Sequence, residues 1–141
     1  MIKVHASVVA INGQGVMLRG PSGAGKSDLS LRLIDEGAEL VSDDYVELYP
    51  QESHIIVKAP SSIQGLMEVR GLGLVKLPFR HKAPLSIVFD LVAQKNIDRL
   101  PARDAFFFAD GIGIPLLRIE GLAPSSPAKV RLALTNLKDP G

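Results

Sequence analysis

The sequence contains no cysteine, and aromatic residues make up only 5% of its 141 residues. Without cysteine, the chain can form neither a disulfide nor a thiolate metal site. No apolar run approaches the roughly 20 residues that span a bilayer, and Met1–His5 lacks the apolar segment of a signal peptide. The formal net charge is +1, with no block of basic residues, so composition does not indicate nucleic-acid binding. We therefore expect a cytoplasmic protein without nucleic-acid or membrane partners.

Size and composition indicate a single folded domain over residues 1–141. Apolar residues make up 46% of the chain, which is enough to bury a sizeable core. The length falls in the range of about 100–200 residues that is typical of one domain. No internal repeat and no long linker divides the sequence.

The clearest motif in the chain fills the eight-position pattern of a phosphate-binding P-loop. It consists of Gly20, Pro21, Ser22, Gly23, Ala24, Gly25, Lys26 and Ser27. The apolar residues Val16–Leu18 before it predict a short buried strand, and Leu29 and Leu33 after it predict a helix over residues 27–36. A glycine-rich turn with an exposed lysine is the simpler alternative, but the flanking strand and helix favour the P-loop.

Each part of this motif has a role in holding phosphate. Glycines let the backbone curl so that its N–H groups converge, and the helix N-terminus adds unpaired N–H groups and the positive end of its dipole. Lys26 is expected to neutralise charge on the terminal phosphates, and the Ser27 hydroxyl to bind Mg²⁺.

The rest of the chain predicts many short strands and only two clear helices. Asn12-Gly13 predicts a hairpin turn between strands over Lys3–Ala10 and Val16–Arg19. Ser126-Pro127 predicts the start of a terminal helix, with Val130, Leu134 and Leu137 on one face. We expect a polar turn over residues 50–53 and a central position in the sheet for the strand over residues 85–92. The other expected strands are residues 39–42, 46–49, 55–57, 66–70, 74–77 and 116–119. This pattern differs from an ordinary doubly wound P-loop enzyme, in which helices and strands alternate.

Three adjacent aromatic residues, Phe106, Phe107 and Phe108, interrupt an otherwise polar region. Neighbouring side chains point in different directions on any regular element. We expect them to lie partly in the core and partly on a contact surface for another subunit or partner.

A pair of acidic residues, Asp43-Asp44, follows the predicted strand over residues 39–42. A strand–loop–helix–strand unit brings the end of this strand beside the phosphate loop. There, one carboxylate can orient a metal ion or its waters while the other accepts a proton from an attacking hydroxyl. Aspartates that simply form a turn at the end of a strand are the alternative.

Four segments in this order, Val4–Ser7, Gly20–Ser27, Leu40–Asp44 and Met67–Leu74, give the chain a family resemblance. Together they resemble the catalytic domain of bacterial HPr kinase/phosphorylase, and the last is similar to that family's Glu-Ile-Arg-Gly-Leu-Gly signature. The resemblance runs from the first residues to Arg99. It implies an α/β fold: a P-loop variant related to phosphoenolpyruvate carboxykinase, with a strand-rich mixed sheet and few helices.

The resemblance also implies an activity and partners. Members of the family use ATP and Mg²⁺, or pyrophosphate as an alternative donor, to phosphorylate a serine of the small carrier protein HPr. The expected substrate here is HPr or its nitrogen-related counterpart in the phosphotransferase system. Family members can reverse the reaction by phosphorolysis, and they assemble as homo-oligomers, specifically hexamers.

Roles for individual residues follow from the matched positions. Lys26 and the Gly20–Ser27 backbone would hold the phosphates, and Ser27 with Glu68 would bind Mg²⁺, which prefers such oxygen ligands. Asp44 matches the general base, which would accept the seryl proton, with Asp43 beside it.

Three further residues take roles from the resemblance, and two of these have simpler alternatives. His5 matches an active-site histidine that positions Asp44 or a phosphate oxygen, although by itself it reads as a surface histidine. Arg70 belongs to the signature segment. Arg99 matches an arginine that stabilises charge on the transferred phosphoryl group, although Asp98-Arg99 alone reads as a solvated charge pair.

The chain departs from the family pattern in three ways. The resemblance starts at the first residues, so we expect no N-terminal regulatory domain, and Asp28 stands where many members have glutamate. Residues 121–127 lack the glycine–arginine character of the family's phosphorolysis loop. We therefore expect kinase chemistry, with phosphorolysis that is weak or served by another basic residue such as Lys129 or Arg131.

Two other functions remain open from the sequence. A small-molecule P-loop kinase or nucleotide hydrolase would need a basic lid, for which Arg80–Lys82 is the one candidate cluster. A nucleotide-binding regulatory module with little turnover would instead contact a partner through Phe106–Phe108.

Overall fold

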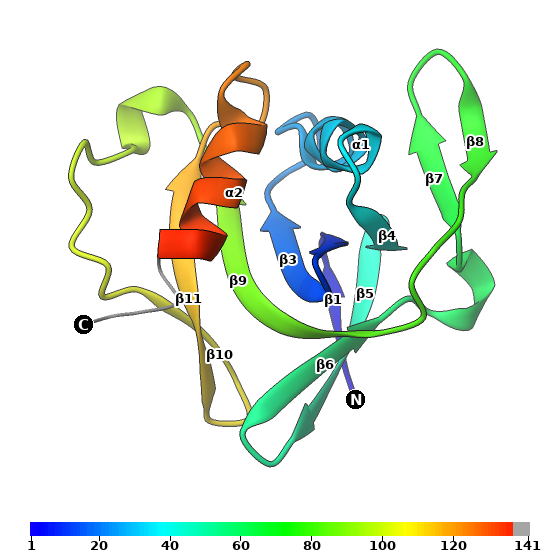
Figure 1. Cartoon of the computed structure of the whole chain (residues 1–141), viewed down its shortest axis with the longest axis horizontal. Helices are drawn as coiled ribbons and strands as arrows, with labels where there is room; N and C mark the ends of the chain where they lie inside the picture. Colours follow the sequence, from blue (N-terminus) through cyan, green and yellow to red (C-terminus); the bar gives the residue numbers. More distant parts are fainter. Residues whose placement is uncertain (137–141) are drawn as a thin grey trace.

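The structure, a computed structural model, describes residues 1–136 (Figure 1). Over this range the chain forms eleven strands, two α-helices and two short 3₁₀ helices. The elements are β1 Ile2–His5, β2 Ser7–Ile11, β3 Gln14–Arg19, α1 Lys26–Asp35, β4 Glu39–Ser42, β5 Tyr45–Gln51, β6 His54–Lys58, η1 Ser61–Ile63, β7 Leu66–Val69, β8 Gly73–Lys76, β9 Ala83–Leu91, η2 Gln94–Asn96, β10 Phe106–Ala109, β11 Ile112–Ile119 and α2 Ser126–Asn136. The expected strand-rich fold with few helices is confirmed. Leu137, predicted on the terminal helix, lies outside the described residues.

A mixed nine-stranded sheet forms the body of the molecule. Its strands follow the order β1-β5-β6-β9-β3-β2-β4, and β11 also pairs with β9 and carries β10 on its other side. Strand β9 is central, as the sequence predicts, because it pairs in parallel with β3 and β11 and antiparallel with β6. Figure 1 shows β9 curving from one part of the sheet into the other. The hairpin β7–β8 forms a separate two-stranded sheet beside α1.

Two apolar clusters cover opposite faces of the central strands. Alternation along a strand assigns neighbouring residues to opposite faces, so Val8 and Met17 join one cluster while Val9 and Val16 join the other. The first cluster includes Leu48 and other residues of β5 and β6, where the sheet folds over itself. The second packs under the helices, through Leu29 and Leu33 of α1 and Val130 and Leu134 of α2. Strand β3 is therefore buried on both faces, which explains its continuous apolar run.

A tight hairpin sets the register of the strand that leads to the phosphate loop. Asn12 and Gly13 both have positive φ angles, 51° and 78°, as a two-residue turn with the right twist requires. Strand β3 is then clamped to β9 by a two-pronged ion pair from Arg19 to Asp90, with distances of 2.8 and 3.1 Å.

One predicted strand, Lys3–Ala10, is wrong as a single element. The strand is interrupted at the buried residue Ala6, because β1 pairs with β5 whereas β2 pairs with β3 and β4. A second interruption, at Asp43-Asp44, separates β4 from β5. The two breaks form one corner of the folded sheet.

Smaller boundary differences have local causes. The polar turn is shorter than predicted, because Pro50 and Gln51 belong to β5. Strand β1 pairs with β5 only as far as Leu48, so the missing N–H of Pro50 disrupts no pairing with β1. Helix α1 begins at Lys26 and ends at Asp35, one residue earlier at each end than predicted.

The three adjacent phenylalanines divide between core and surface. Phe107 packs against the core, while Phe106 and Phe108 are 46% and 66% exposed. The predicted core contribution is confirmed, and a role for the exposed rings as a contact surface stays a prediction. Within residues 1–136, no helix has the length and apolar character needed to cross a membrane.

The segment before α2 packs directly on the phosphate loop. A Cβ atom on Gly121 would lie 2.1 Å from the carbonyl oxygen of Ala24, so only glycine fits there. Arg32 of α1 donates a hydrogen bond to the carbonyl oxygen of Ala123 at 3.1 Å, and Arg131 of α2 contacts Glu36 at 2.7 Å. These contacts hold α2 and the segment before it against α1.

Replacing Gly121 with alanine is expected to lower the free energy of unfolding by about 3 kcal/mol, because the backbone around Ala24 must move to admit the methyl group. Urea denaturation measures the change. Gly113→Ala is the matched control: its Cβ would meet a ring atom of Phe108 at 2.9 Å, and that exposed ring can rotate away. Equal stability of the two variants would contradict the packing described here.

Candidate active site

The phosphate loop connects β3 to α1 and leaves the helix N-terminus open. Gly23 and Gly25 have φ angles of 87° and 103°, which residues with side chains rarely adopt. The loop is closed by a hydrogen bond from the Ala24 N–H to the Pro21 carbonyl, at 3.0 Å. Because α1 has no side-chain N-cap, the amides of its first turn lack partners within the helix. Together with the helix dipole, they form an anion-binding site.

A pocket of about 490 Å³ lies above this N-terminus. Its walls come from β1, the phosphate loop, α1, the corner between β4 and β5, β7 and the loop before α2. Ten predicted site residues line it: His5, Ser22, Gly23, Gly25, Lys26, Ser27, Asp43, Asp44, Glu68 and Arg70. The fold therefore brings together residues that are far apart in the sequence.

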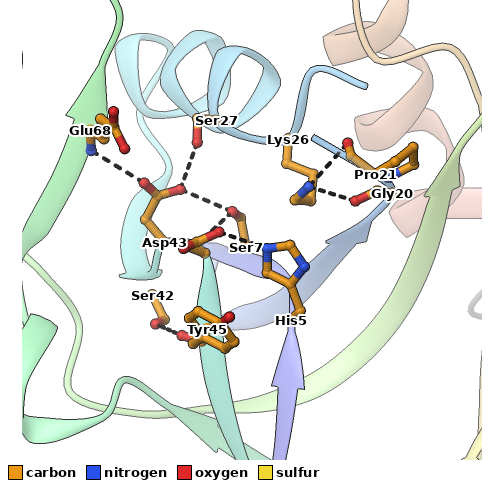
Figure 2. A network of polar contacts seen from close by, with 11 residues as sticks. His5, Ser7, Gly20, Pro21, Lys26, Ser27, Ser42, Asp43, Tyr45 and Glu68 are labelled. Carbon is orange, nitrogen blue, oxygen red and sulfur yellow. Dashed lines mark hydrogen bonds and ion pairs between the residues drawn. The ribbon is translucent and has the colours of Figure 1, made fainter. Parts of the chain in front are cut away.

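Lys26 lies against the inner side of the loop. Its side chain is mostly buried, and its ammonium group donates hydrogen bonds to the carbonyl oxygens of Gly20 and Pro21, at 2.5 and 3.3 Å (Figure 2). Gly20 and Pro21 thus do not line the pocket, but their carbonyl groups hold the Lys26 side chain in place. An ammonium group has three donors, so one remains for an anion in the pocket.

Asp43 is a buried carboxylate at the centre of the polar network in Figure 2. Its Oδ1 atom accepts hydrogen bonds from the hydroxyls of Ser7 and Ser27, both at 2.9 Å. Its Oδ2 atom accepts the backbone N–H of Glu68 at 3.3 Å. The side chain therefore joins β2, α1 and β7, and the three donors compensate for its removal from water.

Asp44 points the other way, toward solvent and His5. The carboxylate Oδ1 of Asp44 lies 2.7 Å from Nε2 of His5, and both side chains are about half exposed, at 60% and 48%. The ring of Tyr45 packs on His5, with 5.0 Å between the ring centroids. This arrangement fixes the imidazole beside the carboxylate, as the sequence comparison with the family predicts.

The backbone at Asp44 is strained. Its φ angle is 74°, and the N–H of Tyr45 bonds to the carbonyl oxygen of Asp43 at 2.9 Å, which makes a tight γ-turn. Such a conformation costs about 1–3 kcal/mol and persists only where the surroundings enforce it. Here the Ser42 hydroxyl donates to the Tyr45 carbonyl oxygen, and the Ser7 hydroxyl accepts the Asp44 N–H at 3.2 Å.

The donor set fits a magnesium ion bound together with phosphates. Within residues 1–136, no group of three or more His, Cys, Asp or Glu side chains could hold a metal ion. Mg²⁺ does not require such a cage, since it usually binds one or two carboxylates, several waters and the phosphates of a substrate. Ser27 Oγ and the Asp43 carboxylate supply hard oxygen atoms side by side, and Glu68 lines the same pocket.

Arg99 is a predicted catalytic residue that does not line the pocket. It is exposed in the loop between η2 and β10, and it is not among the residues that line the pocket. Its assigned role therefore stays a prediction without support from the geometry. Ala24 also lies outside the lining, because it packs against Gly121.

Sequence reasoning missed several residues of the site. Asp28, Leu31, Val69 and Leu122 line the pocket, and Ser7 donates a hydrogen bond to Asp43 in its wall. Leu122 contacts Gly25 from far along the chain, so no local pattern could reveal it. Ser7 belongs to a segment that resembles the family, but its residue type alone indicates no role.

The family model described as the HPr Serine kinase C-terminal domain matches residues 1–125. The chain belongs to this family. The HPr kinase/phosphorylase of Bordetella pertussis is 38% identical over 127 residues, which cover 82% of this chain and 41% of that protein. The HPr kinase/phosphorylase of Polaromonas sp. is 34% identical over 152 residues, covering 96% of this chain and 48% of that protein. The chain thus spans less than half the length of these curated relatives.

A solved structure confirms the expected fold. The Hpr(Ser) kinase/phosphatase from Coxiella burnetii superposes with a TM-score of 0.83. The match covers 98% of this chain and 91% of that chain, at 24% sequence identity. At this identity the likeness concerns the fold.

Replacing Asp43 with asparagine is expected to lower the free energy of unfolding by about 2 kcal/mol, because a buried charged acceptor with three donors loses one acceptor position. Asp44→Asn, at an exposed carboxylate on the same turn, is the control and should change stability by less than about 0.5 kcal/mol. Chemical denaturation of both variants measures the difference. Similar stabilities would contradict the central role of the Asp43 carboxylate.

Proposed function

We propose that this domain is an ATP-dependent serine kinase that phosphorylates a phosphotransferase-system carrier protein, either HPr or its nitrogen-related counterpart. The observation that carries the proposal is the Asp44–His5 pair, at 2.7 Å, on the wall of the pocket that contains the phosphate loop. A phosphate site and a carboxylate that can accept a proton are the two parts that phosphoryl transfer to a hydroxyl needs. Family membership and the names of the relatives support the same activity.

Each residue then has a role in positioning or in proton transfer. The open amides of α1 and the ammonium group of Lys26 would hold the β- and γ-phosphates of ATP. When bound, Mg²⁺ supplies charge neutralisation on those phosphates, and Ser27, Asp43 and Glu68 would hold it. The carrier's seryl oxygen forms a bond to the γ-phosphorus as the bond from that phosphorus to ADP breaks. The seryl proton passes to Asp44, which His5 holds in place.

The elements around the pocket suggest where a protein substrate would enter. The β7–β8 hairpin stands apart from the body on one side of α1, and the loop before α2 lies on the other side (Figure 1). Arg70, which lines the pocket and follows β7, is exposed at this entrance. We infer that the seryl segment of the carrier enters between these two walls, with Arg70 close to the incoming phosphoacceptor. Pyrophosphate, which has the same phosphate chemistry, would serve as an alternative donor.

A small-molecule kinase is less well supported, because its basic lid is missing from the pocket. In the candidate cluster Arg80–Lys82, the Arg80 guanidinium is engaged with Glu39 at 3.1 Å and with the Lys82 carbonyl oxygen at 3.2 Å. None of these residues is among those that line the pocket. The experiment with Asp44→Asn, described next, distinguishes the kinase from the regulatory module.

Replacing Asp44 with asparagine is expected to lower kcat for carrier phosphorylation by about 10²–10⁴-fold, because the proton acceptor is lost. Binding of Mg²⁺ and ADP should persist, since the phosphate loop is intact. Mass spectrometry of the carrier measures the first quantity, and calorimetry the second. Asp110→Asn is a matched control, because Asp110 is also exposed and has a positive φ angle, 50°, in the β10–β11 turn. Failure of the wild-type domain to phosphorylate any carrier would favour the regulatory module.

The reverse reaction is expected to be weak. Residues 121–127 lack the glycine–arginine character of the family's phosphorolysis loop, and Gly121 packs on the phosphate loop. Arg131, one candidate substitute, is paired with Glu36 at 2.7 Å, which leaves the exposed Lys129. Incubation of phosphoserine HPr with inorganic phosphate should release little pyrophosphate, with the Bordetella pertussis relative run alongside for comparison. Pyrophosphate release as fast as the forward reaction would refute this expectation.

Two further parts of the proposal concern assembly and location. We propose a homo-oligomer, with the family's hexamer as its form, in which the exposed rings of Phe106 and Phe108 contribute contact surface. We also propose a cytoplasmic location, where HPr-type carriers would meet the domain.

A further inference from the structure

Ser7 contacts both aspartates of the active-site corner, although no role for it follows from the family's motifs. It is the first residue of β2 and has no exposed surface. Its Oγ atom donates to Oδ1 of Asp43 at 2.9 Å and accepts the backbone N–H of Asp44 at 3.2 Å. A hydroxyl can do both at once because it carries one donor and two acceptor lone pairs. Figure 2 shows Ser7 beside Asp43, with a dashed line from its hydroxyl to the carboxylate.

The two contacts act on different parts of the corner. The bond to Asp43 restrains a carboxylate whose Oδ1 atom also accepts from Ser27, and therefore fixes how the carboxylate faces α1. The bond from Asp44 satisfies an N–H group inside a strained turn, where φ is 74°. Without an acceptor, that N–H group would favour a relaxed backbone that moves the Asp44 side chain away from His5.

The position of Ser7 in the sheet makes this contact rigid. Ser7 pairs with Leu18 in the hairpin that leads into the phosphate loop. The contacts of its hydroxyl therefore fix the distance between the strand before the phosphate loop and the corner that carries both carboxylates. A side chain on a buried strand holds a position more accurately than one on a loop.

We propose that Ser7 is a positioning residue for the phosphoryl-transfer site, which sets the orientation of Asp43 toward the metal position and of Asp44 toward the phosphoacceptor. The inference rests on the proposed function for its catalytic part. Its metal-binding part can be measured without any turnover. A purely structural role would instead change only the stability of the fold.

The test compares wild type with Ser7→Ala, Ser7→Thr and Ser30→Ala. Ser30 is the matched control, because it is also fully buried and its hydroxyl bonds to the Lys26 carbonyl oxygen within α1, at 2.8 Å, facing no carboxylate. Mn²⁺ binding in the presence of ADP is measured by electron paramagnetic resonance. The kcat and the KM for ATP are measured with HPr as phosphoacceptor. Thermal unfolding is recorded for every variant, and Ser7→Cys replaces Ser7→Ala if the alanine variant does not fold.

Ser7→Ala is expected to weaken Mn²⁺ binding by about 10–100-fold and to lower kcat by a similar factor, because it removes a partner of the carboxylate that faces the metal. The KM for ATP should change by less than about threefold, since the phosphate loop keeps its amides. Ser7→Thr keeps the hydroxyl and should restore both quantities to within about fivefold of wild type.

Two outcomes would overturn the inference. One is a Ser7→Ala protein that matches Ser30→Ala in Mn²⁺ binding and kcat, whatever its thermal stability. The other is a loss of function that Ser7→Thr does not restore, although that variant folds. If wild type phosphorylates neither HPr nor its nitrogen-related counterpart while Ser7→Ala still weakens Mn²⁺ binding, the proposed function fails and the positioning role stands.

Discussion

The carboxylate of Asp43 is the interaction on which the geometry of the site depends. A buried ionised group costs several kcal/mol unless donors surround it, and the donors here come from three elements that are remote in sequence. Ser7 belongs to the sheet, Ser27 to the helix that follows the phosphate loop, and Glu68 to the separate hairpin. The need to satisfy one anion therefore fixes the distances between the parts that together make the pocket.

The fold supports this arrangement because the strands that carry it are buried on both faces. Strand β3 has the folded sheet on one side and the two helices on the other, so its end holds the phosphate loop rigidly. The corner formed by the breaks at Ala6 and Asp43-Asp44 lies beside that end. Two adjacent segments of the chain change direction sharply here, which leaves backbone groups without strand partners. The buried hydroxyls of Ser7 and Ser42 form hydrogen bonds with these groups. The same feature that bends the sheet thus presents Asp44 to His5.

Features that depend on neighbouring residues could be predicted from the sequence, and features that depend on distant packing could not. The Asn12-Gly13 turn, the phosphate loop and the start of α2 follow from local backbone preferences, and all three are found as expected. The break at Ala6 was missed because apolar residues continue on both sides of it, so periodicity gives no sign of the bend. The contact of Gly121 with Ala24 depends on topology alone. The residues that line the pocket near the loop could be predicted because phosphate chemistry restricts their type, whereas nothing local restricts Arg99 or Ser7.

The parallel pairing of β3 with β9 has a consequence for how the protein is made. Residues such as Arg19 and Asp90 come together only after a long intervening segment has been synthesised, and non-local parallel contacts form slowly. The pocket then receives one wall from His5 and another from Leu122. A nascent chain on the ribosome therefore holds an exposed glycine-rich loop without a complete pocket until Leu122 has emerged. The complete pocket is therefore available only at the end of folding.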